Sequence, residues 1–221
     1  MIRLTAFNWV PPFAEGLVRD LRIRWALEEA GLAYEENLIA QGQQNTPEYR
    51  CVQPFGQVPV IEENGLTLFE TGAILLHIGE RSETLLPPDP GARASAIQWV
   101  FAALNSIEPF LQQLTLIDLF YTDEQWAKLR RPGALEFAEK RLDALSARLG
   151  DRDYLDSDRF TAGDLMMTTV LEIVRHSDLI ASRPNLDAYG KRCKARPAYA
   201  KALADQIAPF AKNAPRGQAA E

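Results

Sequence analysis

Two short stretches of the sequence carry groups that could hold a ligand by its polar atoms. In the first, Pro59 follows Val58 inside a predicted strand, 58–61. A proline has no N–H to give to a neighbouring strand, so it is tolerated at an edge, at a bulge, or where something other than a strand lies alongside. If the bond between the two residues is cis, the N–H and C=O of Val58 point outward and can pair with an extended peptide. A trans proline on an edge strand, with no ligand, is the alternative.

The second stretch, Glu70 and Thr71, favours the ligand-binding interpretation. The pair ends a predicted strand, 66–69, and opens a helix predicted from Thr71 to about Arg81. Thr71 can cap this helix, while the first N–H groups, at the positive end of the helix dipole, face any nearby carboxylate. Glu70 adds a negative charge beside them. A ligand with an ammonium and a carboxylate on one carbon atom would satisfy both.

The elements that must position these residues alternate in type over the first eighty residues. A strand at 2–7, a helix at 16–31 and a strand at 33–39 form a predicted βαβ unit. An irregular polar stretch, 40–56, then precedes the two short strands and the helix described above. The prediction is therefore an α/β domain of order β-α-β, loop, β-β-α over residues 1–82.

Beyond residue 82 the sequence changes character. Residues 83–90 are predicted to form a linker, because three prolines lie close together there. Residues 91–221 are predicted to form an all-α domain with a disordered tail near 213–221. The predicted helices are one over 92–121 that bends at Pro109, one within 123–150 that starts again near Pro132, and others from Thr161, Asn185 and Pro197.

The helix from Thr161 has the strongest local signal. Thr161 and Asp164 have the spacing of a capping box, with Asp in place of the usual Glu or Gln, just before an apolar run. The pair should be worth about 0.5 to 2 kcal/mol to the helix. We interpret it as structural rather than catalytic.

With these elements in place, the sequence resembles the cytosolic glutathione transferases along essentially the whole chain. The stretch CVQPFGQVPVIEENGLTLFETGAILLHIGER, residues 51–81, carries the resemblance, and FTAGDL, residues 160–165, matches the family's buried capping box. The resemblance implies a thioredoxin-like first domain and an all-helical second domain. It further implies that Val58 pairs with the cysteinyl backbone of glutathione, that Glu70 and Thr71 hold its γ-glutamyl amino acid, and that Pro59 is cis.

The resemblance implies a homodimeric enzyme that uses glutathione as a co-substrate, with no further cofactor, against a small electrophile, disulfide or hydroperoxide. In such an enzyme the thiol must ionise. A thiol has a reference pKa of about 8.5, and lowering it by about two units requires roughly 2.7 kcal/mol. A helix N-terminus supplies at most about 2 kcal/mol, so one charge-assisted hydrogen bond of ~1.5 to 3 kcal/mol should be needed.

The first loop departs from the family pattern at this point. Residues 8–17 contain no Ser, Thr, Tyr or Cys, and Leu17 stands where a catalytic hydroxyl is expected. The candidate donors are the Asn8 amide, the Trp9 indole, the backbone N–H groups of 16–18 and the guanidinium of Arg19, which has the strongest electrostatic case. Arg19 as a solvated or salt-bridged helix residue is the alternative. The missing hydroxyl also keeps open a second function, a non-catalytic binding or assembly module.

Other parts of the substrate site are assigned to candidates only. Donors for the glycyl carboxylate are Gln43, Gln44, Arg50 and Gln57. Trp9 and Phe13 are expected to pack or to wall the pocket of the second substrate. Phe101, Asn105 and Glu108 lie on one face of the first long helix by their spacing and could line that pocket, or equally be core and interface.

Composition excludes several other classes. The 221 residues carry a net charge of −6, and no basic stripe suited to nucleic acid emerges. No apolar run approaches the ~20 residues that cross a bilayer, and the N-terminus does not look like a secretory signal, so we expect a cytoplasmic protein off the membrane. Cys51 and Cys193 are expected to be free thiols, and His77 and His176 lack the neighbours that a metal site needs.

Overall fold

The structure is a computed structural model that describes residues 1–155 and 158–215. By their contacts the residues divide into two compact units, Met1–Ser82 with Pro197–Glu221, and Glu83–Arg196. The sequence from residue 197 therefore belongs with the strands by its contacts, whereas the sequence analysis placed it in the helical domain. Each unit is described by itself.

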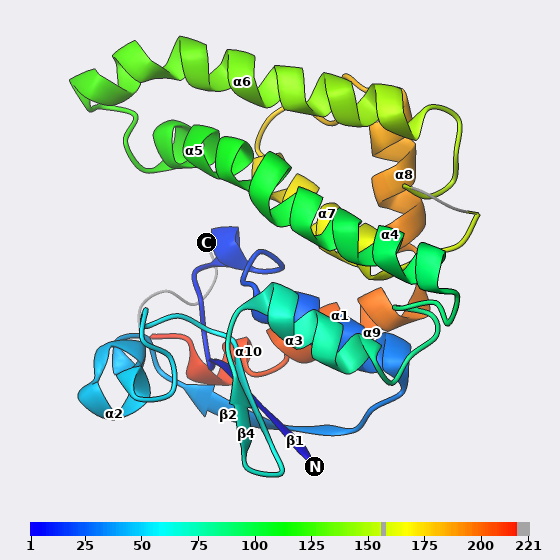
Figure 1. Cartoon of the computed structure of the whole chain (residues 1–221). Helices are drawn as coiled ribbons and strands as arrows, with labels where there is room; N and C mark the ends of the chain where they lie inside the picture. Colours follow the sequence, from blue (N-terminus) through cyan, green and yellow to red (C-terminus); the bar gives the residue numbers. More distant parts are fainter. Residues whose placement is uncertain (156–157, 216–221) are drawn as a thin grey trace. The chain divides into compact units, whose positions relative to one another are not determined.

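The first unit is built on a four-stranded mixed sheet (Figure 1). The strands are β1 (Ile2–Phe7), β2 (Tyr34–Ile39), β3 (Val60–Glu63) and β4 (Leu66–Leu68), in the order β2-β1-β3-β4. β1 runs parallel to β2 and antiparallel to β3, and β3 runs antiparallel to β4. This arrangement confirms the predicted thioredoxin-like order of elements.

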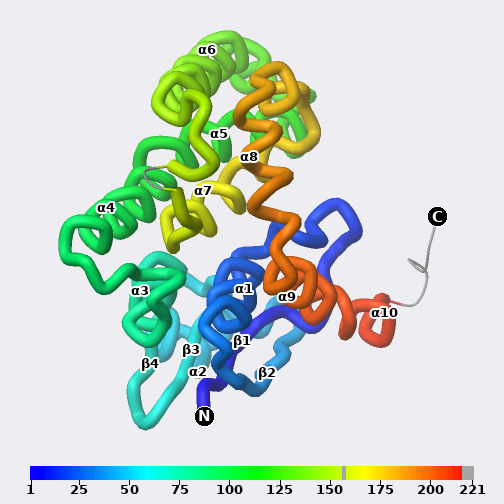
Figure 2. The backbone as a smooth tube through the Cα atoms, turned by 90° about the vertical axis from the view of Figure 1, so that its right-hand side faces the viewer, coloured from blue at the N-terminus to red at the C-terminus, as the bar shows by residue number. Residues whose placement is uncertain are grey.

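Helices cover the sheet because their apolar faces need burial. The helices of this unit are α1 (Asp20–Ala30), α2 (Pro47–Arg50), α3 (Thr71–Gly79), α9 (Pro197–Ile207) and α10 (Phe210–Asn213), with short 3-10 turns at Pro12–Ala14 and Gln43–Asn45. α1 packs against both α3 and α9, and Figure 2 shows α9 beside α1. Trp25 of α1 is fully buried and meets the ring of Tyr199 of α9 edge-on, with the ring centroids 4.9 Å apart.

Two predicted boundaries in this unit were wrong. The first helix begins at Asp20 rather than at Gly16, because Gly16 has a φ of 75°, outside the helical range, and the residues up to Arg19 form turns. β3 begins at Val60, so Pro59 lies just ahead of the strand and removes no hydrogen bond from the ladder.

The second unit is all helical. Its elements are α4 (Pro90–Phe101), a π-helical turn (Ala102–Ile107), α5 (Glu108–Leu119), α6 (Gln125–Leu149), α7 (Ala162–Leu171), a 3-10 turn (Glu172–Val174) and α8 (Pro184–Lys194). α7 is the central helix, with nine of its ten residues buried, and it contacts α4, α5 and α8. The predicted all-α domain is confirmed.

The two internal prolines of the long helices behave differently. The residues before Pro109 take π-helical hydrogen bonds, because Pro109 has no N–H for the usual i to i−4 bond, and the bend expected there stays a prediction. At Pro132 the prediction of a restart was wrong. α6 runs through that residue from Gln125 to Leu149.

The predicted capping box of α7 is confirmed. One carboxylate oxygen of Asp164 accepts hydrogen bonds from the Thr161 amide at 2.9 Å and the Thr161 hydroxyl at 3.1 Å. The other oxygen accepts from the Leu155 amide at 3.0 Å and the Tyr189 hydroxyl at 3.1 Å. Burial raises the pKa of Asp164 above its ordinary value, while these bonds act in the opposite direction.

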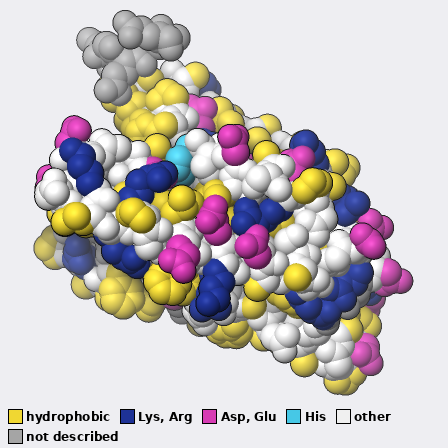
Figure 3. Space-filling model, turned by 90° about the horizontal axis from the view of Figure 1, so that it is seen from above, with side chains coloured by type: hydrophobic (Ala, Val, Ile, Leu, Met, Phe, Trp, Pro, Cys, Tyr) yellow, Lys and Arg dark blue, Asp and Glu magenta, His cyan; other side chains and the backbone are white. Residues whose placement is uncertain are grey.

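One face of the molecule mixes charges of both signs (Figure 3). Seen from above Figure 1, Lys and Arg side chains alternate with Asp and Glu, and hydrophobic side chains lie exposed between them (Figure 3). No helix within the described residues has the length and apolar character to cross a bilayer. Of the tail predicted to be disordered, Asn213 ends α10, and 216–221 lie outside the described residues.

Candidate functional site

The sheet brings three of the predicted site residues to one end. β1 ends at Phe7, at the end of the sheet where its antiparallel partner β3 begins at Val60. β4, which is antiparallel to β3, ends at Leu68 on the same side. Asn8, Val58 and Glu70 therefore leave the sheet at the same end.

Among the described residues the backbone of Val58 is unpaired, although the residue as a whole is only 8% exposed. The bond between Val58 and Pro59 is cis, which confirms that prediction. Val58 belongs to no strand, and within residues 1–155 and 158–215 neither its N–H nor its C=O takes part in a hydrogen bond. A main-chain donor and acceptor on one residue can hold one residue of an extended peptide.

The loop before Val58 is held in shape by two side chains. The buried Gln53 side-chain oxygen accepts from the amides of Phe55 at 2.7 Å and Gln57 at 3.2 Å. The Tyr49 hydroxyl donates to the carbonyl of Gln57 at 2.7 Å. Burial raises the pKa of Tyr49 to about 12, so this donor keeps its proton at neutral pH. The N–H and the C=O of Gln57, the residue before Val58, are thus both held by side chains of the loop.

Gly56 is required by the same loop. Its φ is 65°, and a Cβ atom there would lie 2.9 Å from the carbonyl oxygen of Gln44 and 3.0 Å from the guanidinium of Arg50. No other residue fits without moving this backbone.

Glu70 adopts a backbone conformation that is rare for a residue with a side chain. Its φ is 70° and its ψ is 116°, and it is the N-cap of α3 without a side-chain cap hydrogen bond. Backbone outliers of this kind cluster at ligand sites. The prediction that Thr71 caps the helix was wrong, because the turn at Glu70 makes Thr71 the first helical residue.

The N-terminus of α3 offers donors to a ligand. The carbonyl of Glu70 accepts the first helical bond, from Ile74 at 2.9 Å. The N–H groups of Thr71, Gly72 and Ala73 have no hydrogen-bond partner among the described residues. These groups sit at the positive end of the helix dipole, which suits a carboxylate.

Arg22 is a residue of this site that the sequence reasoning missed. It lies on α1, is almost fully buried, and its guanidinium donates to the hydroxyl oxygen of Thr71 at 3.3 Å. Because a hydroxyl has a single O–H, this contact leaves the Thr71 proton free to be donated elsewhere. The only sequence signal was a cation on the first predicted helix, which does not reveal contact with a residue 49 positions away.

The candidate thiol donors lie between β1 and α1. The backbone N–H of Asn8 donates to the carbonyl of Ile39 at 2.9 Å, which continues the β1–β2 ladder. Asn8 as a whole is partly exposed. Trp9 is also partly exposed, and Phe13 is 57% exposed. Arg19 is partly exposed, is placed just before α1, and has interaction partners within the protein.

The candidate donors to the glycyl carboxylate differ in the hydrogen bonds that their side chains already make within the loop. Arg50 donates to the carbonyl of Pro54 and to the side chain of Asn45, both at 3.1 Å. The side-chain oxygens of Gln43 and Gln44 accept from backbone amides within the loop. The exposed side chain of Gln57 makes no hydrogen bond within the described residues.

The candidates on the helical unit do not share a face as expected. Phe101 and Asn105 are exposed, whereas Glu108 is buried. The expected spacing assumed an unbroken α-helix, and the π-helical turn over Ala102–Ile107 shifts the residues that follow it. The assignment of Phe101 and Asn105 to a second-substrate pocket stays a prediction.

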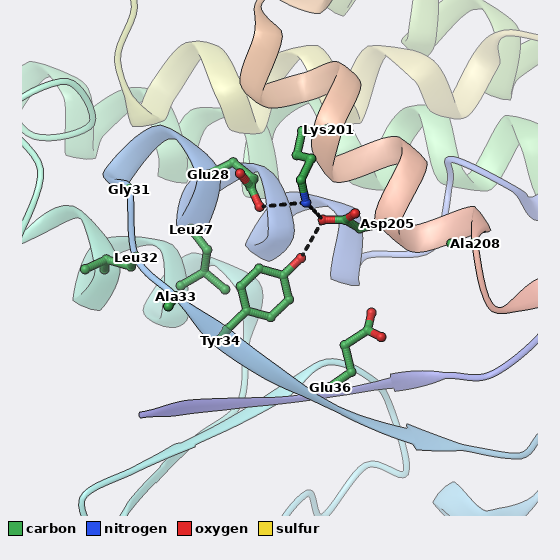
Figure 4. A pocket seen from close by; sticks show the side chains of 10 residues that line it. All are labelled: Leu27, Glu28, Gly31, Leu32, Ala33, Tyr34, Glu36, Lys201, Asp205 and Ala208. Carbon is green, nitrogen blue, oxygen red and sulfur yellow. Dashed lines mark hydrogen bonds and ion pairs between the residues drawn. The ribbon is translucent and has the colours of Figure 1, made fainter.

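A pocket of about 640 Å³ lies elsewhere in the first unit, between the end of α1, β2 and α9 (Figure 4). None of the predicted site residues lines it. Four of its polar side chains pair with one another: Lys201 forms ion pairs with Asp205 and, at 3.7 Å, with Glu28, and the Tyr34 hydroxyl donates to Asp205 at 3.3 Å. Glu36 pairs instead with Arg24. Burial is the main cause that raises the pKa of Tyr34 to about 12.

Comparison with known proteins agrees with this geometry. A family model described as the N-terminal domain of glutathione S-transferase matches residues 4–80, and one for the C-terminal domain matches residues 113–197. Glutathione S-transferase F14 of Arabidopsis thaliana is 30% identical, over 81% of this chain and 76% of that protein. Glutathione S-transferase 4 of Zea mays is 31% identical, over 96% of each chain.

A solved structure extends the comparison to three dimensions. A glutathione transferase from Burkholderia graminis, crystallised with two glutathione molecules bound per subunit, superposes with a TM-score of 0.80. It is 27% identical, and the match covers 92% of this chain and 87% of that one. The chain belongs to the glutathione S-transferase family and carries both of its domains.

Proposed function

We propose that this glutathione transferase binds the tripeptide at the end of the sheet where Val58 and Glu70 lie. The cysteinyl N–H and C=O pair with the C=O and N–H of Val58. The γ-glutamyl carboxylate meets the Thr71 hydroxyl and the first N–H groups of α3, and its ammonium meets Glu70. The observation that carries the proposal is the unpaired main chain of Val58 beside an uncapped helix N-terminus on the same end of the sheet.

The thiol of the bound tripeptide then lies toward the loop between β1 and α1. The thiol proton passes to solvent, and the thiolate attacks the electrophile. A carbon–sulfur bond forms while the leaving group departs with its electron pair. Arg19 is the proposed source of positive charge that favours the thiolate, and Asn8 is the proposed neutral donor.

The remaining substrate contacts are proposed from exposure. Gln57 and Gln44 have side-chain N–H groups that can reach a glycyl carboxylate. Trp9 and Phe13 of the first unit present aromatic surface to an apolar electrophile.

The enzyme and a non-catalytic module differ in what happens to the thiol. Bound thiolate absorbs in the ultraviolet, so its absorbance against pH gives the pKa of the bound thiol. The enzyme requires a value below the ordinary ~8.5. A bound thiol with an unshifted pKa, together with no conjugation of a test electrophile such as 1-chloro-2,4-dinitrobenzene, would show a module that only binds.

The binding site itself is tested by calorimetric titration of glutathione into matched variants. Glu70→Gln removes the charge that meets the ammonium, so we expect affinity to fall by about tenfold or more. Glu80→Gln, at the other end of α3, removes an exposed carboxylate away from the proposed contacts and should leave affinity unchanged. Equal affinity of both variants would contradict the proposed contact.

We also propose that the protein is a homodimer of the cytoplasm. Family membership supports both parts. Large exposed side chains such as Phe55, Phe120 and Leu129 are of the kind that dimer interfaces cover.

A further inference from the structure

Gln206, near the end of α9, is almost completely buried, at 1% exposure. Its side chain makes three hydrogen bonds to the segment that leads into and opens α1. Its side-chain oxygen accepts from the amide of Gly16 at 3.1 Å. Its side-chain nitrogen donates to the carbonyl of Val18 at 3.2 Å and to the carboxylate of Asp20 at 2.7 Å. All four residues lie in the first unit, where α9 packs along α1 (Figure 2).

These contacts decide which backbone donor remains in the first loop. The Gly16 amide is taken by Gln206, and the Leu17 amide donates to the carbonyl of Ala14 at 3.0 Å. The Val18 amide has no hydrogen-bond partner within the described residues. Of the backbone N–H groups of residues 16–18, only that of Val18 has no partner among the described residues and is left for a ligand.

Gln206 also fixes the direction of that N–H. Three neighbouring peptide groups are bonded: Glu15–Gly16 to Gln206 through the Gly16 N–H, Gly16–Leu17 to Ala14 through the Leu17 N–H, and Val18–Arg19 to Gln206 through the Val18 carbonyl. The Val18 carbonyl also accepts from the Leu21 amide at 3.0 Å, which ties it to the first turn of α1. The Leu17–Val18 peptide group, which carries the Val18 N–H, therefore lies between bonded peptide groups on both sides.

Asp20 fixes Gln206 in turn. The second carboxylate oxygen of Asp20 accepts from Arg24 at 2.8 Å, so the carboxylate is held in place by an ion pair on its own helix. With Asp20 accepting from it, the Gln206 amide has one orientation, with nitrogen toward Asp20 and oxygen toward Gly16. A side chain that both donates and accepts is required at this position.

We propose that Gln206 is a positioning residue for the thiol, which it serves by holding the Val18 N–H as the backbone donor to the glutathione sulfur. The inference rests on the proposed function. It explains how a loop without a side-chain hydroxyl supplies a fixed donor, and it gives α9 a part in activating the thiol.

The test is the pKa of the bound thiol, measured by ultraviolet absorbance against pH. Gln206→Met keeps the length of the side chain and removes its hydrogen bonds. We expect it to raise the thiol pKa by about half a unit or more and to slow conjugation below that pKa by about threefold or more. Affinity for S-methylglutathione, which has no ionisable thiol, should change by less than about twofold. Lys201→Met, on the same helix but away from the loop, should change none of these values.

The outcomes separate the two proposals. A thiol pKa that is lowered in the unaltered protein and equally low in Gln206→Met would overturn this inference and leave the proposed function in place. A thiol pKa that is unshifted in the unaltered protein would overturn both. Equal loss of affinity for glutathione and S-methylglutathione, with no change of thiol pKa, would show a merely structural role and also overturn the inference.

A measurement on the unaltered protein covers the case in which Gln206→Met does not fold. In protein labelled with ¹⁵N-valine, the Val18 amide proton should move downfield as bound glutathione ionises, because the hydrogen bond to a thiolate is stronger than that to a thiol. With S-methylglutathione bound, the same signal should stay still over that pH range. A Val18 amide proton whose chemical shift does not change as bound glutathione ionises would overturn the inference.

Discussion

At the scale of single residues, Glu70 connects backbone conformation to ligand binding. A non-glycine residue with a φ of 70° and a ψ of 116° is held there by its surroundings at a cost of about 1 to 3 kcal/mol. This cost falls at the start of α3, beside the helix's first N–H groups. The strain is therefore an expected property of the binding site.

Glu70→Gly tests this connection. Glycine adopts positive φ readily, so we expect the free energy of unfolding to rise by about 1 kcal/mol while affinity for glutathione falls, because the carboxylate is gone. Glu70→Gln keeps the backbone penalty, so it should lose affinity without gaining stability. Thermal unfolding and calorimetric titration measure the two effects. A glycine variant less stable than the unaltered protein would refute the assignment of strain.

The two cysteines should differ sharply in reactivity. Cys51 is exposed, whereas Cys193 is buried and its pKa is raised to about 12, mainly by burial. We predict that Ellman's reagent modifies one thiol in the folded protein and two in denaturant, and that Cys51→Ser abolishes the reaction of the folded protein. Two reactive thiols before unfolding would contradict the burial of Cys193.

The sequence revealed the residues that act locally and missed those that act across the fold. Val58, Glu70 and Thr71 stand beside a proline, a turn and a helix start, each of which leaves a local pattern. Arg22 and Gln206 matter because α1 meets α3 and α9, and no local pattern encodes these contacts between distant residues. The positive φ of Glu70 was equally invisible, because glutamate has no preference for it.

At the scale of elements, α7 depends on its N-terminal cap. Asp164 accepts four hydrogen bonds in a buried site, two of them from backbone amides. We predict that Asp164→Asn lowers the free energy of unfolding by about 2 to 3 kcal/mol, since the amide presents a donor where an acceptor is needed. Urea unfolding measures the change.

Asp187→Asn is the matched control for the cap. Asp187 lies in the first turn of α8, where its partner is the exposed Lys191, so the change should stay within about 0.5 kcal/mol. If Asp164→Asn were as mild as this control, the cap would not be the anchor of the second unit that its burial indicates.

Element types were predictable from sequence, and some boundaries were not. The period of apolar residues and the turn residues were enough to predict the four strands and the long helices. Gly16 and Pro132 show why the boundaries failed. A glycine at a predicted helix start took positive φ, and a proline within a helical pattern was accommodated inside α6. The Gly16 amide is bonded to Gln206 of α9, a long-range contact that no local pattern encodes, whereas Pro132 is exposed and nothing in the structure explains why α6 continues through it.

At the scale of the whole molecule, the proposed homodimer is tested by its mass. Analytical ultracentrifugation at micromolar concentration should give about twice the chain mass of 24.7 kDa. Phe55 is 62% exposed on a loop that Gln53 holds rigid, so it is a suitable anchor for a partner. Phe55→Glu should shift the protein toward monomer, whereas Phe13→Glu should not. A monomeric unaltered protein would contradict the proposal.

The proposed function depends most on where glutathione binds. A crystal structure of the protein with glutathione answers this directly. We predict that the N–H and C=O of the cysteinyl residue lie about 2.7 to 3.2 Å from the C=O and N–H of Val58, with the γ-glutamyl carboxylate at the first N–H groups of α3. Glutathione bound elsewhere, for example in the pocket beside Tyr34 and Asp205, with no ligand on Val58, would contradict the account.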